Sequence, residues 1–270
     1  MSTTDTATTN VPVVASAVDA GLATITLQRP AASNALDQAA KKQLLTALQA
    51  VAADDSVRAV LLVADGKNFC VGQDLAEHVA GLEADPAHAM DTVGEHYNPL
   101  LTVLARIQVP VVIAINGACV GAGLGIALAG DIRVAGEGAK FATAFTGIAL
   151  ASDSGLSHTL VTALGPSRAT GLMLLGDRFT ATQALDWGLV HRVVPDAELR
   201  DAATTLARQL ADGPTGAYTL VKALVSASAP GLAEALERER EAQERLGQSR
   251  DHRAAVDAFL NKQTPLFEGR

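Results

Sequence analysis

Short apolar segments alternate with amphipathic ones along the first half of the chain. Residues 38–53 predict an amphipathic helix, because apolar residues recur on one face of the segment. A hairpin turn is expected at residues 19–21, and helical material from 84 to 106. The predicted strands are 13–17, 22–27, 59–64, 109–115, 132–135 and 140–143. Strands that alternate with helices pair in parallel, so the pattern predicts an α/β fold.

The second half of the chain has a mainly helical pattern. From Ser154 onward, pairs of glycine and proline break the pattern, at 165–166, 213–214 and 230–231. The charge-rich segment 231–248 predicts a helix with a solvated face. No linker is long enough to separate two independent domains. We expect a Ser/Thr-rich disordered tail over 1–10, an α/β core over 11–200 and a helical region over 201–270.

The stretch 107–130 contains no charged residue and holds five glycines. Its length makes it formally a membrane-span candidate, but it begins with β-branched residues, an Asn-Gly pair interrupts it, and a helix-like segment follows from about Gly123. Gly121 and Gly123 also fit a dinucleotide-binding fingerprint, but Ile126 stands where the third glycine belongs. We interpret the stretch as a buried strand whose exit turn presents amides at a helix N-terminus, where the dipole favours negative charge.

Composition argues against several classes of protein. The formal net charge of −8 over 270 residues leaves no basic stripe for nucleic acid. The N-terminus has no apolar secretory segment. Cys70 and Cys119 lack metal-ligand spacing and are interpreted as small buried thiols, as expected in a reducing compartment. We therefore expect a cytoplasmic protein with no metal site, no nucleic-acid partner and no membrane span.

Two glycine-containing turns follow predicted parallel strands, one over residues 69–75 and the other over 116–123. Amides from two neighbouring strand exits can converge on one carbonyl oxygen and stabilise the negative charge that develops there. Losing one such donor typically slows a reaction by the equivalent of about 3 kcal/mol. Each turn alone is more typical of a structural loop, but the pair indicates a site for an oxyanion.

Ordered motifs run from Ala23 to Arg270. They are ITLQRPAASNAL, FCVGQDL, INGACVGAGLGIALAGDIRVA, AKFATAF, LGDRFTATQALDWGLVHRVV and AFLNKQTPLFEGR. Together they resemble the crotonase, or enoyl-CoA hydratase/isomerase, superfamily. The resemblance implies a spiral of ββα units with a helical C-terminal region, and a trimer or dimer of trimers built through that region. It also implies an acyl-CoA substrate, with no cofactor beyond the coenzyme A that the substrate carries.

By the same resemblance, the backbone amides of Gln73 and Ala122 would form the oxyanion hole that holds the thioester oxygen. Other positions that would line the substrate and CoA site are Gly72, Asp74, which would also order the loop, Leu75, Gly121 and Phe145. Phe259 and Lys262 would approach the nucleotide part of CoA, often from a neighbouring subunit, and Lys67 would meet a phosphate. For each lysine the alternative is a solvated charge.

The hydratases of this superfamily use two glutamates, one to activate water and one to protonate the α-carbon. The resemblance places these positions at Gly125 and Phe145, neither of which can titrate. General acid–base groups contribute roughly 10²- to 10⁴-fold each. A plain hydratase is therefore not expected.

Asp153, in IALASDSG, is the carboxylate with a precedent in the superfamily, and its segment resembles that of the ring-epoxide isomerases of phenylacetate degradation. One carboxylate suffices for isomerisation, because it can remove a proton from the α-carbon and return it elsewhere. Burial against Phe145, Ile148 and Leu156 would raise its pKa toward a useful value. The local sequence alone favours a helix N-cap instead, which would hold Asp153 ionised and make it a weak base.

The main hypothesis is therefore an acyl-CoA isomerase of the crotonase fold. His158 could titrate near neutrality, but a packed or surface histidine is the more common role at such a position. A Δ3-Δ2-enoyl-CoA isomerase would use the same oxyanion hole and the same single carboxylate. A non-catalytic acyl-CoA-binding homologue, in which Asp153 only caps a helix, is the alternative from another class.

Overall fold

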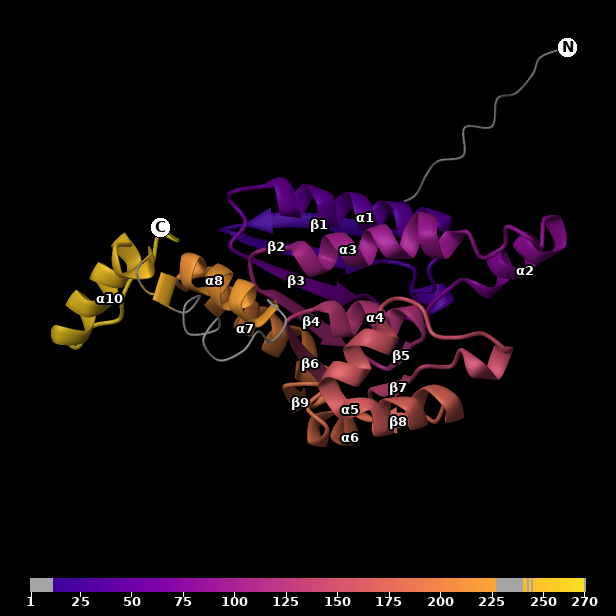
Figure 1. Cartoon of the computed structure of the whole chain (residues 1–270). Helices are drawn as coiled ribbons and strands as arrows, with labels where there is room; N and C mark the ends of the chain where they lie inside the picture. Colours follow the sequence, from indigo (N-terminus) through magenta and orange to yellow (C-terminus); the bar gives the residue numbers. More distant parts are fainter. Residues whose placement is uncertain (1–11, 227–239, 242, 244, 270) are drawn as a thin grey trace, which may run out of the picture.

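The computed structural model describes residues 12–226, 240, 241, 243 and 245–269 (Figure 1). The expected tail over 1–10 and most of the expected helix over 231–248 lie outside these residues. The strands are β1 (Val14–Asp19), β2 (Leu22–Leu27), β3 (Ala59–Ala64), β4 (Val111–Ile115), β5 (Ala118–Val120), β6 (Ile132–Gly136), β7 (Lys140–Ala142), β8 (Phe179–Thr180) and β9 (Arg192–Val194). The helices are α1 (Gln38–Ala53), α2 (Leu75–Ala84), α3 (Asn98–Arg106), α4 (Ala122–Ala129), α5 (Leu156–Leu175), α6 (Ala181–Asp186), α7 (Leu199–Ala211), α8 (Thr215–Ser226) and α10 (Arg250–Leu260). A π-helix (Val93–Tyr97) leads into α3.

The larger sheet has the strand order β1-β2-β3-β4-β6-β9. β1 and β2 form the expected antiparallel hairpin, and its two turn residues, Ala20 and Gly21, both have positive φ angles. Each later pair, from β2–β3 to β6–β9, is parallel. Every residue of β3 is buried, which accounts for its uninterrupted apolar sequence.

Alternate residues of the central strands belong to two separate hydrophobic cores. In β3, Val60 and Leu62 pack in the core that also contains buried residues of α1, α3, α4 and α5. Leu61 and Val63 pack in a smaller core with Leu199 and three alanines of α7. Helices therefore cover both faces of the sheet (Figure 1), and the turns after the carboxyl ends of β3 and β4 are left to form a site.

A smaller sheet has the order β5-β7-β8, and it repeats the unit from which the fold is built. β4, β5 and α4 follow one another, and so do β6, β7 and α5, so each unit gives one strand to each sheet and then a helix. Backbone pairing at Cys70 and Cys119, an isolated parallel β-bridge, joins the turn after β3 to β5. This ββα order confirms the expected α/β fold. The uncharged stretch 107–130 is divided between β4, β5 and α4.

The structure departs from the sequence-based expectation in several elements. The short strands β5, β8 and β9 were not expected, because two or three residues carry too little periodicity to identify a strand. The helical material expected over 84–106 is interrupted, since α2 ends at Ala84 and α3 begins only at Asn98. The expected break at 165–166 is a kink within α5, where Gly165 has a φ of 74°.

The C-terminal region divides into two parts. The proposed boundary at residue 200 falls inside α7, which packs on β3, β4 and β6 as part of the core. α8 and α10 instead lie beyond one end of the strands, on the side away from α2 (Figure 1). Arg58 connects them to the core by donating hydrogen bonds to the carbonyl oxygens of Gly213, at 2.7 Å, and Phe267, at 3.1 Å.

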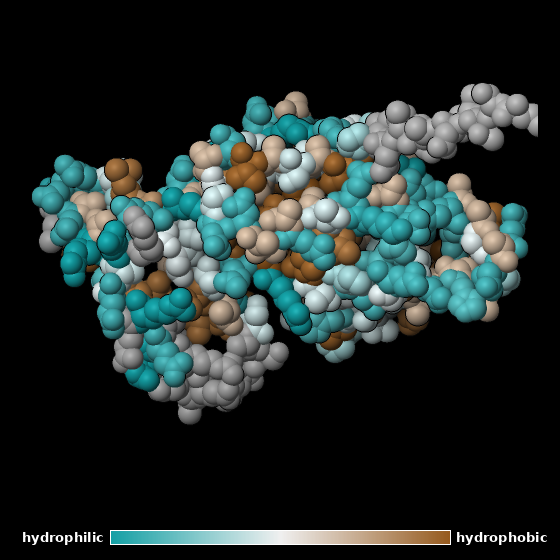
Figure 2. Space-filling model, turned by 90° about the horizontal axis from the view of Figure 1, so that it is seen from above, coloured by the Kyte–Doolittle hydropathy of each residue, from teal (hydrophilic) through white to brown (hydrophobic). Residues whose placement is uncertain are grey.

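Figure 2 shows the face that carries α1, where hydrophilic and hydrophobic residues are interspersed. Among the helices that the structure describes, none is long and apolar enough to cross a membrane.

Candidate active site

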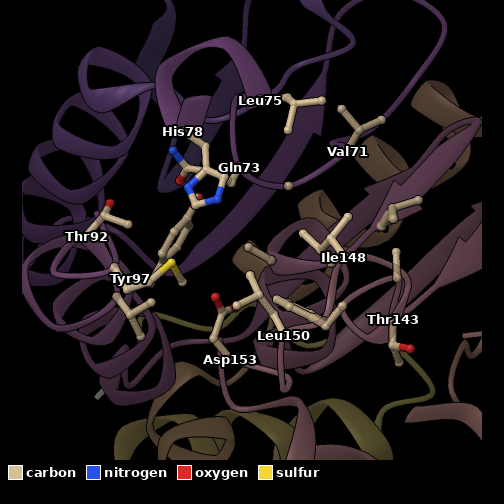
Figure 3. Close-up of a pocket in the computed structure, with 18 residues that line it drawn as sticks. Val71, Gln73, Leu75, His78, Thr92, Tyr97, Thr143, Ile148, Leu150 and Asp153 are labelled. Carbon is tan, nitrogen blue, oxygen red and sulfur yellow. The ribbon is translucent and has the colours of Figure 1, made fainter. Parts of the chain in front are cut away.

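One apolar pocket lies where the turns after β3 and β4 meet the loop before α5 (Figure 3). Its volume is about 660 Å³ including the open mouth. The residues that line it are Val71, Gly72, Gln73, Leu75, His78, Met90, Thr92, Val93, Tyr97, Val120, Gly121, Ala122, Thr143, Ala144, Phe145, Ile148, Leu150 and Asp153. The pocket therefore gathers the expected site residues of both glycine turns, except Asp74, together with Asp153.

The two glycine turns touch each other at the pocket wall. A Cβ added to Gly72 would lie 3.3 Å from the amide nitrogen of Ala122 and 3.2 Å from the carbonyl oxygen of Val120. Gly72 and Gly121 have φ angles of +88° and +56°, which favour glycine. Small residues with left-handed backbone thus let the Gln73 and Ala122 turns approach closely enough to act on one ligand atom.

The amides of Gln73 and Ala122 are both available to a ligand. On either side of Gln73, the Gly72 carbonyl accepts from the Leu36 amide at 2.8 Å, and the Asp74 amide donates to the Leu36 carbonyl at 3.1 Å. Within the described residues, neither the Gln73 amide nor the Ala122 amide donates to a protein group. Ala122 is the first residue of α4, where amides lack helical partners and the dipole favours negative charge.

Asp153 faces the same pocket, and its carboxylate points into the cavity in Figure 3. The alternative that it caps α5 is wrong, because the cap position is Gly155 and no side chain accepts a hydrogen bond from the helix there. The carboxylate accepts a hydrogen bond from the Ser154 hydroxyl at 2.8 Å. Burial raises the pKa of Asp153 above its ordinary value, although the Ser154 hydrogen bond opposes that effect. A carboxylate with a raised pKa in a pocket wall is suited to general-base chemistry, and that role for Asp153 stays a prediction.

Gly125 packs closely against the loop that carries Asp153. A Cβ at this position would lie 2.5 Å from both the Cβ and the carbonyl oxygen of Ser154. Ser154 itself is buried and has a positive φ of 52°. No side chain can therefore stand at 125 unless the Asp153 loop moves.

Phe145 stands at the other position where the resemblance places a hydratase glutamate. It lies in the pocket wall with its ring against Gly121.

A polar network behind the pocket was not expected from the sequence. The buried Lys41 of α1 donates to Gln73 Oε1 at 3.1 Å, to Glu77 Oε1 at 2.7 Å and to Thr92 Oγ1 at 2.7 Å. The Tyr97 hydroxyl donates to the same Gln73 oxygen at 2.6 Å. Lys41 lies on the buried face of α1 with Leu44 and Leu48. A lysine on the apolar face of a predicted helix is the signal in the sequence that could have pointed to this network.

Asp74 does not line the pocket. Its carboxylate accepts from the Ala76 and Glu77 amides at the start of α2 and pairs with Arg29 at 3.0 Å. Partial burial opposes ionisation, but the hydrogen bonds from the Glu77 amide and Arg29 outweigh it and lower the pKa of Asp74. The side chain thus helps to order the turn over residues 69–75, and any contact with substrate stays a prediction.

Three further candidates lie outside the pocket in this chain. Lys67 and His158 are exposed and are absent from the lining, and so is the exposed Lys262. Phe259 lies in α10, on the side of the molecule away from α2 (Figure 1). Their roles in binding CoA or substrate stay predictions. In the described part of the chain, no cluster of three His, Cys, Asp or Glu residues is placed to hold a metal ion.

Comparison with known proteins agrees with this geometry. The sequence model of the enoyl-CoA hydratase/isomerase family matches residues 17–270. The 1,2-epoxyphenylacetyl-CoA isomerase of Escherichia coli (strain K12) is 40% identical over 262 residues, which cover 95% of this chain and 98% of that protein. A trans-2-decenoyl-acyl-carrier-protein isomerase of Streptococcus mutans is 34% identical, covering 94% of this chain and 97% of its own.

Solved structures give the same result. A Mycobacterium abscessus protein described as an enoyl-CoA hydratase/isomerase is 60% identical and superposes with a TM-score of 0.93, covering 95% of this chain and 100% of that one. The chain therefore belongs to the enoyl-CoA hydratase/isomerase family, a group of crotonase-fold enzymes that act on acyl-CoA thioesters.

Proposed function

We propose that this enzyme is an acyl-CoA isomerase that acts on a ring epoxide, 1,2-epoxyphenylacetyl-CoA, with Asp153 as its single acid–base group. The observation that carries the proposal is a carboxylate that caps nothing and faces the same pocket as two unengaged amides. The similarity to the E. coli ring-epoxide isomerase supports the choice of substrate. The apolar lining, including Phe145, Leu150 and Val93, suits an aryl acyl group.

In the proposed reaction the thioester oxygen lies between the amides of Gln73 and Ala122. Asp153 removes a proton from the α-carbon, and the electron pair of that C–H bond moves toward the thioester oxygen to give an enolate. The two amides stabilise this negative charge. The electron pair then returns from the thioester oxygen and forms a double bond between the α-carbon and the adjacent ring carbon, while the epoxide C–O bond at that ring carbon breaks. The protonated Asp153 gives its proton to the epoxide oxygen that is released. No atom is gained or lost, so an isomerisation needs only this one carboxylate.

Hydration would need a second positioned group to activate water. Gly125 and Phe145 stand where the resemblance places the hydratase glutamates, and neither can accept or donate a proton. The contact between Gly125 and Ser154 supports the proposal further, because it leaves no space for a glutamate at 125. These two positions favour an isomerase over a hydratase.

The first test compares Asp153→Asn with the unaltered enzyme on 1,2-epoxyphenylacetyl-CoA. We expect normal folding and a loss of turnover of at least about 10²-fold, the usual contribution of a general base. Asp186→Asn is the matched control, because Asp186 is exposed on α6 and lies outside the pocket, and it should keep full turnover. Near-normal turnover by Asp153→Asn would exclude this residue as the base.

A Δ3-Δ2-enoyl-CoA isomerase is the second candidate, because the S. mutans relative is described as an isomerase of a decenoyl thioester. Turnover of a Δ3-enoyl-CoA in place of the epoxide would select it. Binding of both thioesters without exchange of the α-proton in deuterated water would instead favour a non-catalytic acyl-CoA-binding protein. We also propose that the enzyme assembles as a trimer or dimer of trimers, with Phe259 and Lys262 near the nucleotide end of CoA.

A further inference from the structure

Lys41 is a charged residue in an almost fully buried position. Its side chain is 1% exposed, and its ammonium group lies 5.4 Å from the centre of the Tyr97 ring. An ammonium group has three N–H donors, and here they match three oxygen acceptors, on Gln73, Glu77 and Thr92. Removing such a group from water is unfavourable unless its partners compensate fully. The geometry at Lys41 is therefore that of a fully satisfied buried cation.

The acceptors of Lys41 come from three separate segments, and two of the acceptors, Gln73 and Thr92, line the pocket. Gln73 belongs to the oxyanion turn, Glu77 to the first turn of α2, and Thr92 to the segment before the π-helix. The Gln73 carboxamide is fixed at both ends, because its oxygen accepts from Lys41 and Tyr97 and its nitrogen donates to Glu77 at 3.0 Å. Its side chain has no freedom to rotate without breaking these bonds.

The backbone of Gln73 is held as well, because the Gly72 carbonyl accepts from the Leu36 amide and the Asp74 amide donates to the Leu36 carbonyl. Within the described residues the Gln73 amide donates to no protein group, although the Gln73 side chain and both neighbouring residues are hydrogen-bonded. A donor that is fixed before the substrate arrives stabilises a developing charge without reorganising. We propose that Lys41 is a positioning residue that holds the Gln73 amide in its direction toward the thioester oxygen, an inference that rests on the proposed oxyanion hole.

The first experiment replaces Lys41 by methionine, which fills similar space and has no donor. We expect kcat to fall by about 10- to 100-fold with a smaller change in KM, since a misplacement of about 1 Å can reduce a rate by 10²-fold. The variant is expected to fold, because Glu77 is 34% exposed and can bind water in place of the lysine. Lys42→Met is the matched control, because Lys42 is the exposed neighbour on the same helix.

A second pair of variants separates positioning from stability. Gln73→Leu keeps the backbone amide and removes the side chain through which Lys41 acts. The losses of kcat in Lys41→Met and Gln73→Leu should therefore not multiply in the double variant, as expected for residues that act through one contact. Tyr97→Phe removes the second donor to the same oxygen and should also lower kcat. Full multiplication of the two losses would overturn the proposal.

A spectroscopic readout makes the test independent of turnover. Phenylacetyl-CoA labelled with ¹³C at the thioester carbonyl serves as the probe, and its carbonyl stretching band should move to lower wavenumber when the oxyanion amides polarise it. We expect a smaller movement in Lys41→Met than in Lys42→Met or the unaltered enzyme. An equal movement in all three would refute the role of Lys41, even if the epoxide proves to be the correct substrate.

The same readout distinguishes the two proposals. A normal band shift with no turnover of the epoxide would reject the proposed substrate and leave the Lys41 comparison valid. No shift in the unaltered enzyme would reject the oxyanion hole at Gln73, and the positioning role would fail with it.

Discussion

The contact between α4 and the Asp153 loop allows a quantitative prediction for Gly125→Ala. The new Cβ would lie 2.5 Å from the Cβ and the carbonyl oxygen of Ser154, whereas ordinary contacts begin at 3.4 Å. The contact is with the Cβ and the backbone of Ser154, so no flexible side chain can rotate away to make room. Relief therefore requires the segment around Ser154 to move by about 0.9 Å, the difference between these distances.

Two effects of this shift can be estimated. Overpacking a filled core destabilises a protein by about 1–3 kcal/mol, and the better helix propensity of alanine offsets about 0.5–1 kcal/mol of that. The net loss in the free energy of unfolding should thus lie between about 0 and 2.5 kcal/mol. Asp153 precedes Ser154 and moves with it, and a displacement near 1 Å reduces turnover by about 10²-fold. We therefore expect a modest loss of stability and a large loss of activity.

Denaturant unfolding and turnover of the epoxide substrate measure the two effects on one preparation. Gly171→Ala in α5 is the control, because nothing lies within 4 Å of the added Cβ. This control should gain about 0.5–1 kcal/mol and keep its turnover, as expected for glycine to alanine within a helix. Native turnover and stability in Gly125→Ala would show that α4 does not support the Asp153 loop.

Further predictions concern protonation, loop order and thiol reactivity. The raised pKa of Asp153 means that turnover should fall with acid at a pH above 3.8, the ordinary value for this group, and a pH profile of kcat/KM that falls only below 3.8 would contradict it. Because the ionised form of this buried group is the unfavourable one, Asp153→Asn should be more stable than the unaltered enzyme at neutral pH. That difference should vanish below about pH 4, where the carboxyl is protonated in both folded and unfolded states, and thermal unfolding at several pH values tests this. Asp74→Ala should lose about 0.5–2 kcal/mol through the missing helix cap, measured by denaturant unfolding, whereas Asp74→Asn should lose less. Cys70 and Cys119 are buried, and burial raises the pKa of Cys70 to about 12, so thiol reagents should label neither before unfolding. Rapid labelling in native buffer would contradict the placement of these thiols.

Much of the fold could be predicted because local patterns and tertiary packing agree. The helix 38–53 and the strand 59–64 were located to the residue, since one has a clear helical face and the other is an uninterrupted apolar run. The sequence also pointed to Gln73, Ala122 and Asp153 as site residues, and the pocket brings all three together, while their roles stay predictions.

Other parts of the site depend on contacts that a linear pattern does not contain. Lys41 is 32 residues from Gln73 in the sequence and 51 from Thr92, so nothing local indicates that they meet. The cap interpretation of Asp153 failed for a related reason. Positive φ angles at Ser154 and Gly155 turn its carboxylate away from the helix, and such backbone geometry follows from packing against Gly125.

The helix α2 contributes to the pocket wall while having no buried residue of its own. Its Leu75 lines the pocket but is 66% exposed, and His78 also lines the pocket. Substitutions in this helix can therefore change the acyl group that is accepted without disturbing the hydrophobic cores. The two glycine turns and the Asp153 loop, by contrast, are held by contacts among buried backbone atoms. The part of the pocket that would perform the proposed reaction is thus built separately from the part that would select the acyl group, and laboratory evolution of new substrates should begin at α2.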